Sequence, residues 1–160
     1  MSDTRAITQT VRYRERLRAP WWFWPPALGL AALIAAEVNM GVQGLPDWVP
    51  HAVLLSVAAV LLTWVGRIEI RVVQESPGGP VELWAGPAHL PVNVISRSAA
   101  VPRSAKSAAL GRQLDPAAYV LHRAWIGPMV LVVLDDPDDP TPYWLVSSRH
   151  PDRVLAALRS

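Results

Sequence analysis

The chain has 160 residues, enough for one ordinary domain or for a membrane anchor followed by a smaller domain. It contains no cysteine, which excludes disulfides, thiolate metal sites and a cysteine nucleophile. Its net charge is only +2, and the ten basic residues after residue 66 are balanced by nine acidic ones. Since nucleic-acid binding requires a basic face on the domain, we expect no nucleic-acid partner.

Residues 1–19 are predicted to form a basic cytoplasmic segment. Five arginines against two acidic residues in the first 20 positions give it an excess of positive charge. Anionic lipid headgroups are the partner that best explains such a local excess beside an apolar run. The candidate contacts are Arg12, Arg14, Arg16 and Arg18.

Two apolar runs predict a transmembrane helical hairpin over residues 20–66, with spans at about 21–41 and 48–66. A bilayer core of about 30 Å requires roughly 20 helical residues, and both runs approach this length. We expect the first helix to start near Trp24, because Pro25 and Pro26 are tolerated only in a first helical turn. The composition thus favours a lipid bilayer as the surroundings of this segment.

The arginines flank the outer ends of the predicted hairpin, whereas the loop between its helices contains no Lys or Arg. By the positive-inside rule this places both termini in the cytoplasm, for a multi-pass protein with two spans. The rival interpretation is a cleaved signal peptide. It is disfavoured because no small-x-small cleavage site follows the first run, and a second apolar run does.

Residues 67–160 are predicted to form a cytosolic α+β domain, a small bent antiparallel sheet or partial barrel closed by a C-terminal helix. Alternating apolar side chains indicate a first strand at residues 67–72. Further strands are expected at 81–85, 90–95, 119–125, 128–134 and 143–147, with a hairpin around Gly127 and only weak helical character within 96–116. A last helix should begin near Pro151 and bury Val154, Leu155 and Leu158.

Two stretches, HLPVNVI and YWLVSSRHPDRVLAAL, resemble the middle and the last strand plus helix of a bacterial pleckstrin-homology-like (PH-like) domain. A closer resemblance covers almost the whole chain and is carried by YRERLRAPWWFW, VGRIEIRV, LGRQLDPAAYVLHRAWI and DDPDDPTPYWLVSSRHP. These motifs are similar to an uncharacterised family of actinobacterial membrane proteins, a domain of unknown function. The resemblance implies a bacterial plasma-membrane protein and implies no activity, ligand or catalytic residue.

The most conspicuous acidic cluster is Asp135, Asp136, Asp138 and Asp139. Its spacing fits the DDxxD pattern that binds magnesium diphosphate, but the interspersed prolines exclude the regular helix on which that pattern works. Carboxylates of this kind could also hold Ca²⁺. A solvated loop is the simpler interpretation, and we expect no metal and no cofactor.

A second basic group, interleaved with serines, suits phosphate or a lipid headgroup: Arg97, Arg103, Lys106 and Arg112. The alternative for this segment is a flexible solvated loop. Glu37 lies near the far end of the first predicted span, where either a solvated side chain or a proton path is conceivable. Gly29, Ala32 and Ala36 could form a small-residue packing face that permits a homo-oligomer.

The sequence therefore favours a non-enzymatic, membrane-anchored module that binds a protein partner or anionic lipid headgroups. Such a module is also suited to be an accessory subunit of a membrane assembly. Two alternatives stay open. One is a metal-dependent enzyme on a membrane substrate using Asp135–Asp139, and the other is a small oligomeric channel or transporter using Glu37.

Overall fold

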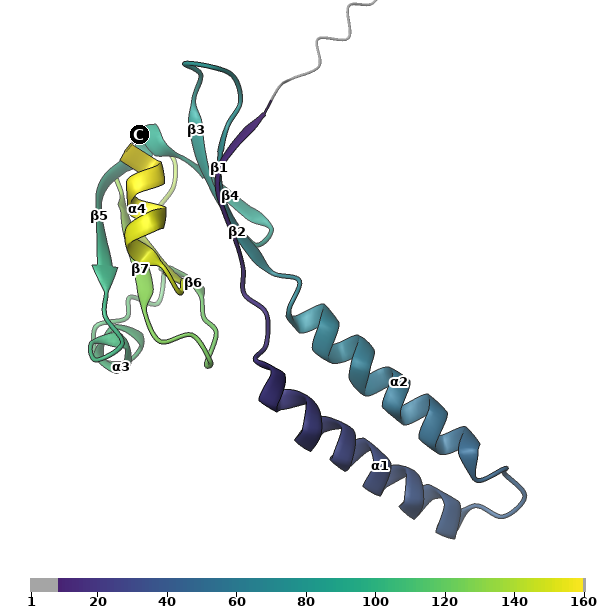
Figure 1. Cartoon of the computed structure of the whole chain (residues 1–160). Helices are drawn as coiled ribbons and strands as arrows, with labels where there is room; N and C mark the ends of the chain where they lie inside the picture. The colour runs from purple at the N-terminus through teal and green to yellow at the C-terminus, as the bar shows by residue number, and fades with distance from the viewer. Residues whose placement is uncertain (1–8, 160) are drawn as a thin grey trace, which may run out of the picture. The chain divides into compact units, whose positions relative to one another are not determined.

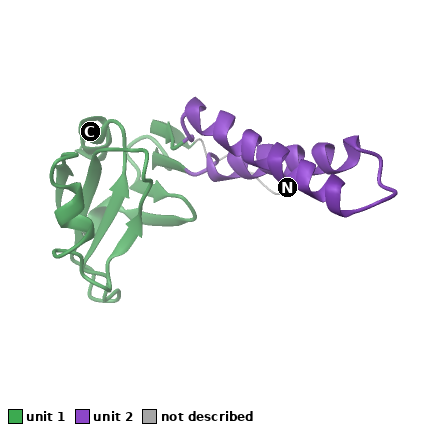
Figure 2. Cartoon of the chain, turned by 90° about the horizontal axis from the view of Figure 1, so that it is seen from below, with its two compact units in different colours: residues 1–17, 69–160 green, residues 18–68 purple. Residues whose placement is uncertain are grey.

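The computed structural model describes residues 9–159, so residues 1–8 of the predicted basic segment lie outside the described part. Within the described residues the chain is an α+β fold of four α-helices and two four-stranded sheets (Figure 1). It divides into two compact units (Figure 2). One combines the N-terminal residues through Leu17 with the chain from Glu69 onward, and the other is Arg18–Ile68. The predicted α+β class is confirmed.

The unit Arg18–Ile68 is a hairpin of two apolar helices, α1 (Trp24–Gly41) and α2 (Trp48–Val65), preceded by the 3-10 turn η1 (Trp21–Phe23). Helix α1 starts at Trp24 as predicted, with prolines in its first turn, where backbone amides have no helical partner anyway. Both helices are long and apolar enough to cross a membrane. Most of their large apolar side chains are exposed, so this unit has no apolar core large enough to explain its composition.

The first sheet is antiparallel, with its strands in the order β1-β2-β3-β4. The strands are β1 (Thr10–Arg16), β2 (Glu69–Gln74), β3 (Val81–Ala85) and β4 (Ala88–Pro91). The predicted alternation at the start of β2 is confirmed, because Ile70 and Val72 are buried while Glu69 and Arg71 are half-exposed. Strand β3 has the predicted bounds.

Strand β1 comes from the segment that the sequence analysis treats as a basic tail. It pairs with β2 across its whole length, with a bulge between Val11 and Tyr13, and its last pair is Arg16 opposite Glu69. The chain therefore leaves the sheet-containing unit at the end of β1 and returns to it at the start of β2. The apolar hairpin is an insertion between two paired neighbouring strands.

The second sheet has the strand order β5-β7-β8-β6. Its strands are β5 (Ile95–Val101), β6 (Tyr119–Leu121), β7 (Met129–Leu134) and β8 (Tyr143–Ser147). The 3-10 turn η2 (Val92–Val94) separates β4 from β5, and the short helix α3 (Lys106–Leu110) follows β5. Strand β8 matches the prediction.

Four sequence predictions in this region are wrong. The strand expected at 90–95 ends at Pro91, because residues 92–94 form the 3-10 turn η2, and the strand expected at 119–125 ends at Leu121. Residues 95–101 form strand β5, although the stretch from Ser96 was expected to lack a strand, because Ser and Ala give it little apolar alternation. The expected hairpin around Gly127 does not form either. Strand β6 pairs in parallel with β8, while β7 lies between β5 and β8.

Helix α4 (Pro151–Arg159) closes the unit and buries Val154, Leu155 and Leu158, as predicted. It contacts strands of both sheets. The core beneath it consists of the inward side chains of the two sheets, with Ile70, Leu83 and Val132 among the most completely buried. Burial of these aliphatic side chains is the main stabilising term for the unit.

A buried carboxylate fastens β1 to the segment that leads into α4. Glu15, only 8% exposed, accepts hydrogen bonds from the hydroxyls of Tyr13 (2.9 Å) and Ser148 (2.7 Å) and from the backbone N–H of Arg149 (2.7 Å). Burial, followed by the hydrogen bond to Glu15 and its charge, raises the pKa of Tyr13 to about 12. Buried carboxylates are tolerated when hydrogen bonds replace their water shell, as they do here.

We expect the substitution Glu15→Ala to lower the free energy of unfolding by about 3 kcal/mol, because the Ser148 hydroxyl and the Arg149 amide lose their acceptor in a buried place. Pulse proteolysis of the full chain in detergent micelles across a urea series measures this. The control is Glu75→Ala, in the exposed turn after β2, where a change within about 0.5 kcal/mol is expected. Equal losses in the two variants would contradict a structural role of Glu15.

Candidate functional site

A cross-strand row of basic and aromatic side chains lies on the outer face of the first sheet. Arg14 is paired with Arg71, Arg71 with Trp84, and Trp84 with His89, one residue from each of the four strands. Directly paired residues project to the same side of a sheet. The Arg71 guanidinium lies 5.4 Å from the centre of the Trp84 ring, which stacks on His89 with ring centres 4.7 Å apart.

Three guanidinium groups of this face converge on one carboxylate, Glu69. The nitrogen–oxygen distances to Glu69 are 2.8 Å from Arg14, 3.5 Å from Arg16 and 3.1 Å from Arg71. Their side chains remain 49%, 49% and 37% exposed, so the excess positive charge faces solvent. We call Arg14, Arg16, Glu69, Arg71, Trp84 and His89 the arginine face.

The negative charge of Glu69 holds the three guanidinium groups of the arginine face in place. Partial burial alone would raise the pKa of Glu69, but the hydrogen bond from Arg14 and the charges of Arg14, Arg71 and Arg16 outweigh it and lower the pKa below its usual value. Glu69 therefore stays ionised at neutral pH and holds the guanidiniums in place. Arginine in fixed positions suits phosphate and carboxylate groups, which it can bind with two parallel hydrogen bonds.

The remaining two arginines predicted before the hairpin lie elsewhere. Arg12 is at the β1 bulge, and its guanidinium donates to the side-chain oxygen of Gln74 at 3.0 Å. Arg18 is the first residue of the helical unit. Only Arg14 and Arg16 of the predicted N-terminal set thus belong to the arginine face.

The second predicted basic group lies on the other sheet, between β5 and the end of α3. Arg97 is on β5, while Arg103 and Arg112 are exposed in the connections on either side of α3. The ammonium group of Lys106 donates to the carbonyls of Arg123 and Ile126, so it fastens the loop before β7. Burial, with a smaller contribution from the charge of Arg103, lowers the pKa of Lys106.

The aspartate cluster forms the loop between β7 and β8, and its carboxylates serve turn geometry. One oxygen of Asp136 accepts from the backbone N–H of Asp138 at 3.0 Å, and one of Asp139 from that of Thr141 at 2.8 Å. Among residues 9–159, no three His, Cys, Asp or Glu side chains are grouped closely enough to hold a metal ion.

Glu37 is exposed on α1, and so is Gly29 of the small-residue face. Near the far end of the hairpin, the Asn39 amide donates to the backbone carbonyl of Asp47 at 2.8 Å, and a ring nitrogen of His51 lies 2.9 Å from the same oxygen. These polar groups therefore close the turn between the helices. None of their contacts involves Glu37.

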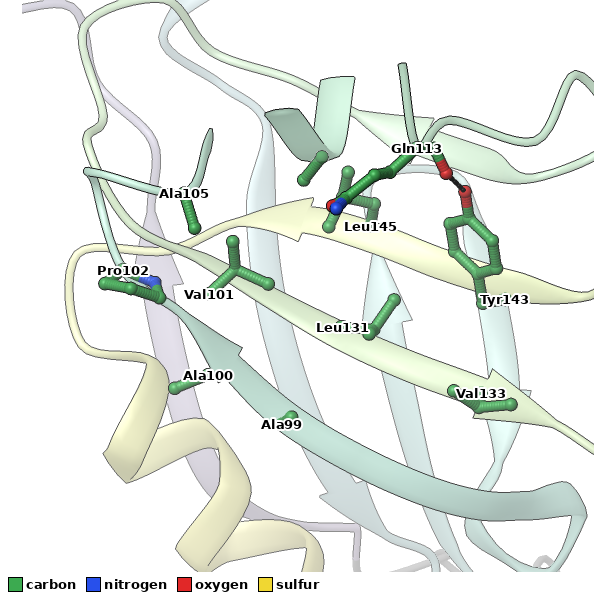
Figure 3. Close-up of a pocket in the computed structure, with 11 residues that line it drawn as sticks. Ala99, Ala100, Val101, Pro102, Ala105, Gln113, Leu131, Val133, Tyr143 and Leu145 are labelled. Carbon is green, nitrogen blue, oxygen red and sulfur yellow. Dashed lines mark hydrogen bonds between the residues drawn. The ribbon is translucent and has the colours of Figure 1, made fainter. Parts of the chain in front are cut away.

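An apolar groove of about 430 Å³ lies on the face of the second sheet that carries Ala99, Leu131 and Leu145 (Figure 3). The segment after β5 forms its other wall through Pro102, Ala105, Ala109 and Gln113. The Tyr143 hydroxyl at its rim is satisfied, because it donates to the carbonyl of Gln113 and accepts from the amide of Asp115. None of the predicted candidate site residues lines this groove.

Sequence reasoning missed Glu15, Glu69 and Trp84 as parts of functional or supporting networks. For Glu15 a signal existed, because residues 10–16 alternate arginine with other side chains at period two, which is typical of a strand. The strand pattern was overlooked because Glu15, a charged residue, occupies a position that faces the core. The partnership of Glu69 and Trp84 with the arginines depends on strand register, which no local pattern contains.

Comparison with known proteins adds the family. The model of the family described as protein of unknown function (DUF3093) matches residues 12–158. A search of curated proteins finds no match. The matched region includes the hairpin and all of β1 except its first two residues.

We expect the pairing of β1 with β2 to weaken in acid because of Glu69. Since its pKa is lower in the folded state, its contribution is fully present above its usual pKa of 4.5 and is lost as pH falls through the lowered value. Urea titrations of the full chain in micelles from roughly pH 7 to pH 3, followed by tryptophan fluorescence, measure this. In Glu69→Gln this part of the acid dependence should disappear, whereas in Glu75→Gln it should remain. An unchanged profile in Glu69→Gln would contradict the expectation.

Proposed function

The chain belongs to the DUF3093 family, and we propose that it is a non-enzymatic, membrane-anchored module whose arginine face binds anionic lipid headgroups. In this proposal the hairpin spans the bacterial plasma membrane and both termini are cytoplasmic. The observation that carries it is the convergence of three exposed guanidiniums on a single carboxylate, in strands that directly flank the hairpin.

The hairpin supports the membrane anchor. Its exposed side chains include Leu30, Leu33, Val60 and Trp64, and an unshielded apolar surface of this kind favours lipid contact. Two helices of this length and composition match the thickness of a bilayer core. The basic residues at both ends of the hairpin favour the cytoplasmic side for the sheet-containing unit.

Chain length supports the assignment of the arginine face to headgroups. Arg16 precedes Trp21, the first residue of η1, by five positions, and an extended chain of that length spans at most roughly 18 Å. Trp21 and Trp22 are exposed, and tryptophan prefers the membrane interface. A cluster with excess positive charge held this close to an interface experiences the negative surface potential of anionic lipids.

The fold supports the PH-like assignment that the sequence suggests. Two sheets of four strands enclose one core, and the C-terminal helix α4 contacts both of them. In this proposal the unit is a PH-like domain in which the first strand pair is interrupted by the membrane anchor.

Native mass spectrometry of the full chain, released from micelles with added lipid, tests the proposal. We expect preferential retention of phosphatidylglycerol over phosphatidylcholine. Arg71→Gln should weaken phosphatidylglycerol retention about five-fold, since one basic residue near an anionic surface contributes about 1 kcal/mol. The matched control is Arg159→Gln at the exposed end of α4, which should stay within about two-fold of wild type.

A third arm adds inorganic phosphate as competitor. Displacement of phosphatidylglycerol by millimolar phosphate would assign the arginine face to free phosphate, and persistence of the lipid supports a headgroup site. Equal retention of both lipids, or an equal loss in Arg71→Gln and Arg159→Gln, would overturn the proposal. A co-purified protein partner released by Arg71→Gln would assign the arginine face to protein binding instead.

A further inference from the structure

The edge strand β5 differs from the other edges of the two sheets. Edge β4 has four residues and ends in Pro91, edge β6 has three, and edge β1 carries alternating arginines. Short strands, proline and charge are the usual devices that block strand addition. Strand β5 has seven residues, mostly Ser and Ala, and none of them is buried.

The outer backbone groups of β5 are available for pairing. Within the described chain its only strand partner is β7, and the backbone N–H of Ile95 is already used at the start of the strand, where it donates to the carbonyl of Val92. Ser96, Ala99 and Ala100 are exposed and small, so they leave the edge accessible. A bulge near Ile95 and one charge, Arg97, are its only protective features.

We propose that a second copy of this chain pairs with β5 through its own β5, antiparallel and about a two-fold axis at Ser98. Two-fold symmetry requires a strand that pairs with itself to be antiparallel. An axis at Ser98 uses the regular part of the strand beyond the bulge, with Arg97 opposite Ala99 of the second copy. The β5-containing sheets of the two copies then form one continuous sheet.

Charge complementarity favours a second copy as the occupant. The acidic β7–β8 loop lies at the Ile95 end of β5, where the amide of Asp135 donates to the carbonyl of Val94 at 2.8 Å. The exposed Arg103 and Arg112 follow the Val101 end. Antiparallel pairing brings the acidic loop of each copy beside the basic segment of the other, so the attraction occurs twice.

The apolar groove fits the same arrangement. Its near wall is Ala99, opposite which the pairing places Arg97 of the second copy. The methylene stem of an arginine covers apolar surface while its charged end remains in water. The two Arg97 side chains are diagonal neighbours, roughly 7–8 Å apart at their Cα atoms, and thus avoid direct opposition.

Cysteine cross-linking of the full chain in native membranes tests this inference. The chain has no cysteine, so a single Ser98→Cys variant can form a disulfide only between molecules. Residues directly opposite in an antiparallel pair have Cα atoms about 4.5–5.5 Å apart, within the range of a disulfide. We expect a covalent dimer of Ser98→Cys on mild oxidation, and monomer from the matched control Ser76→Cys in the exposed turn between β2 and β3.

A charge exchange tests the complementarity in the Ser98→Cys background. Asp138→Arg and Arg112→Asp should each lower dimer yield about five-fold, since each change affects two symmetric contacts. The double variant should restore the yield, which a merely local disturbance would not allow. Yields unaffected by either change, or no rescue in the double variant, would overturn the role of charge and with it the argument for a second copy.

Three other outcomes would overturn the inference as a whole. They are equal cross-linking of Ser98→Cys and Ser76→Cys, a Ser98→Cys adduct with a different protein, and no dimer from a folded variant. If Ser98→Cys does not fold, the double variant Arg97→Cys/Ala99→Cys replaces it, because each new cysteine faces the other across the axis. These variants leave the arginine face intact, so failure here is distinguishable from failure of the proposed headgroup site.

Discussion

The pairing of β1 with β2 is the constraint on which the rest of the structure depends. The two strands are joined through the whole apolar hairpin, yet they meet in register down to Arg16 and Glu69. Closing such a connection costs entropy, but the cost rises only logarithmically with length, and the paired helices shorten the effective loop. The ion pairs at one end of β1 and the Glu15 network on its inner side offset that cost.

The same pairing explains how several arginines can lie together on one face. Arg14 and Arg71 are directly opposite each other, an arrangement that is unfavourable for like charges. Glu69 contacts both guanidiniums and Trp84 provides an aromatic face for Arg71, so the repulsion is reduced while the excess charge is kept. A cluster that is internally braced but not neutralised is suited to an anionic partner whose headgroups are themselves mobile, because the protein side requires little reordering on binding.

The sequence pattern predicted those elements whose hydrophobic periodicity is visible in the segment itself. The apolar runs, the alternation of β2 and the amphipathic face of α4 depend only on neighbours along the chain, and all were found from the sequence. Strand β1 was missed because Glu15 stands at a core-facing position, and β5 because Ser and Ala give no alternation. The partners of β6 and β7 follow from non-local pairing with β8, for which loop signals at Gly127 were no guide. In the candidate site, the arginines could be proposed from the sequence because of their charge. That Glu69 and Trp84 contact them follows only from the register of β1, β2 and β3.

The two candidate surfaces lie on different sheets and depend on different physics. The arginine face offers exposed charge, whose influence salt screens over about 10 Å. The β5 edge offers backbone hydrogen bonds, which are short-ranged and indifferent to lipid composition. Because the core and α4 separate these surfaces, occupation of one leaves the groups of the other available. A pair of such modules joined at β5 would present two arginine faces, and two weak headgroup contacts held in one particle bind an anionic surface far more tightly than either does alone.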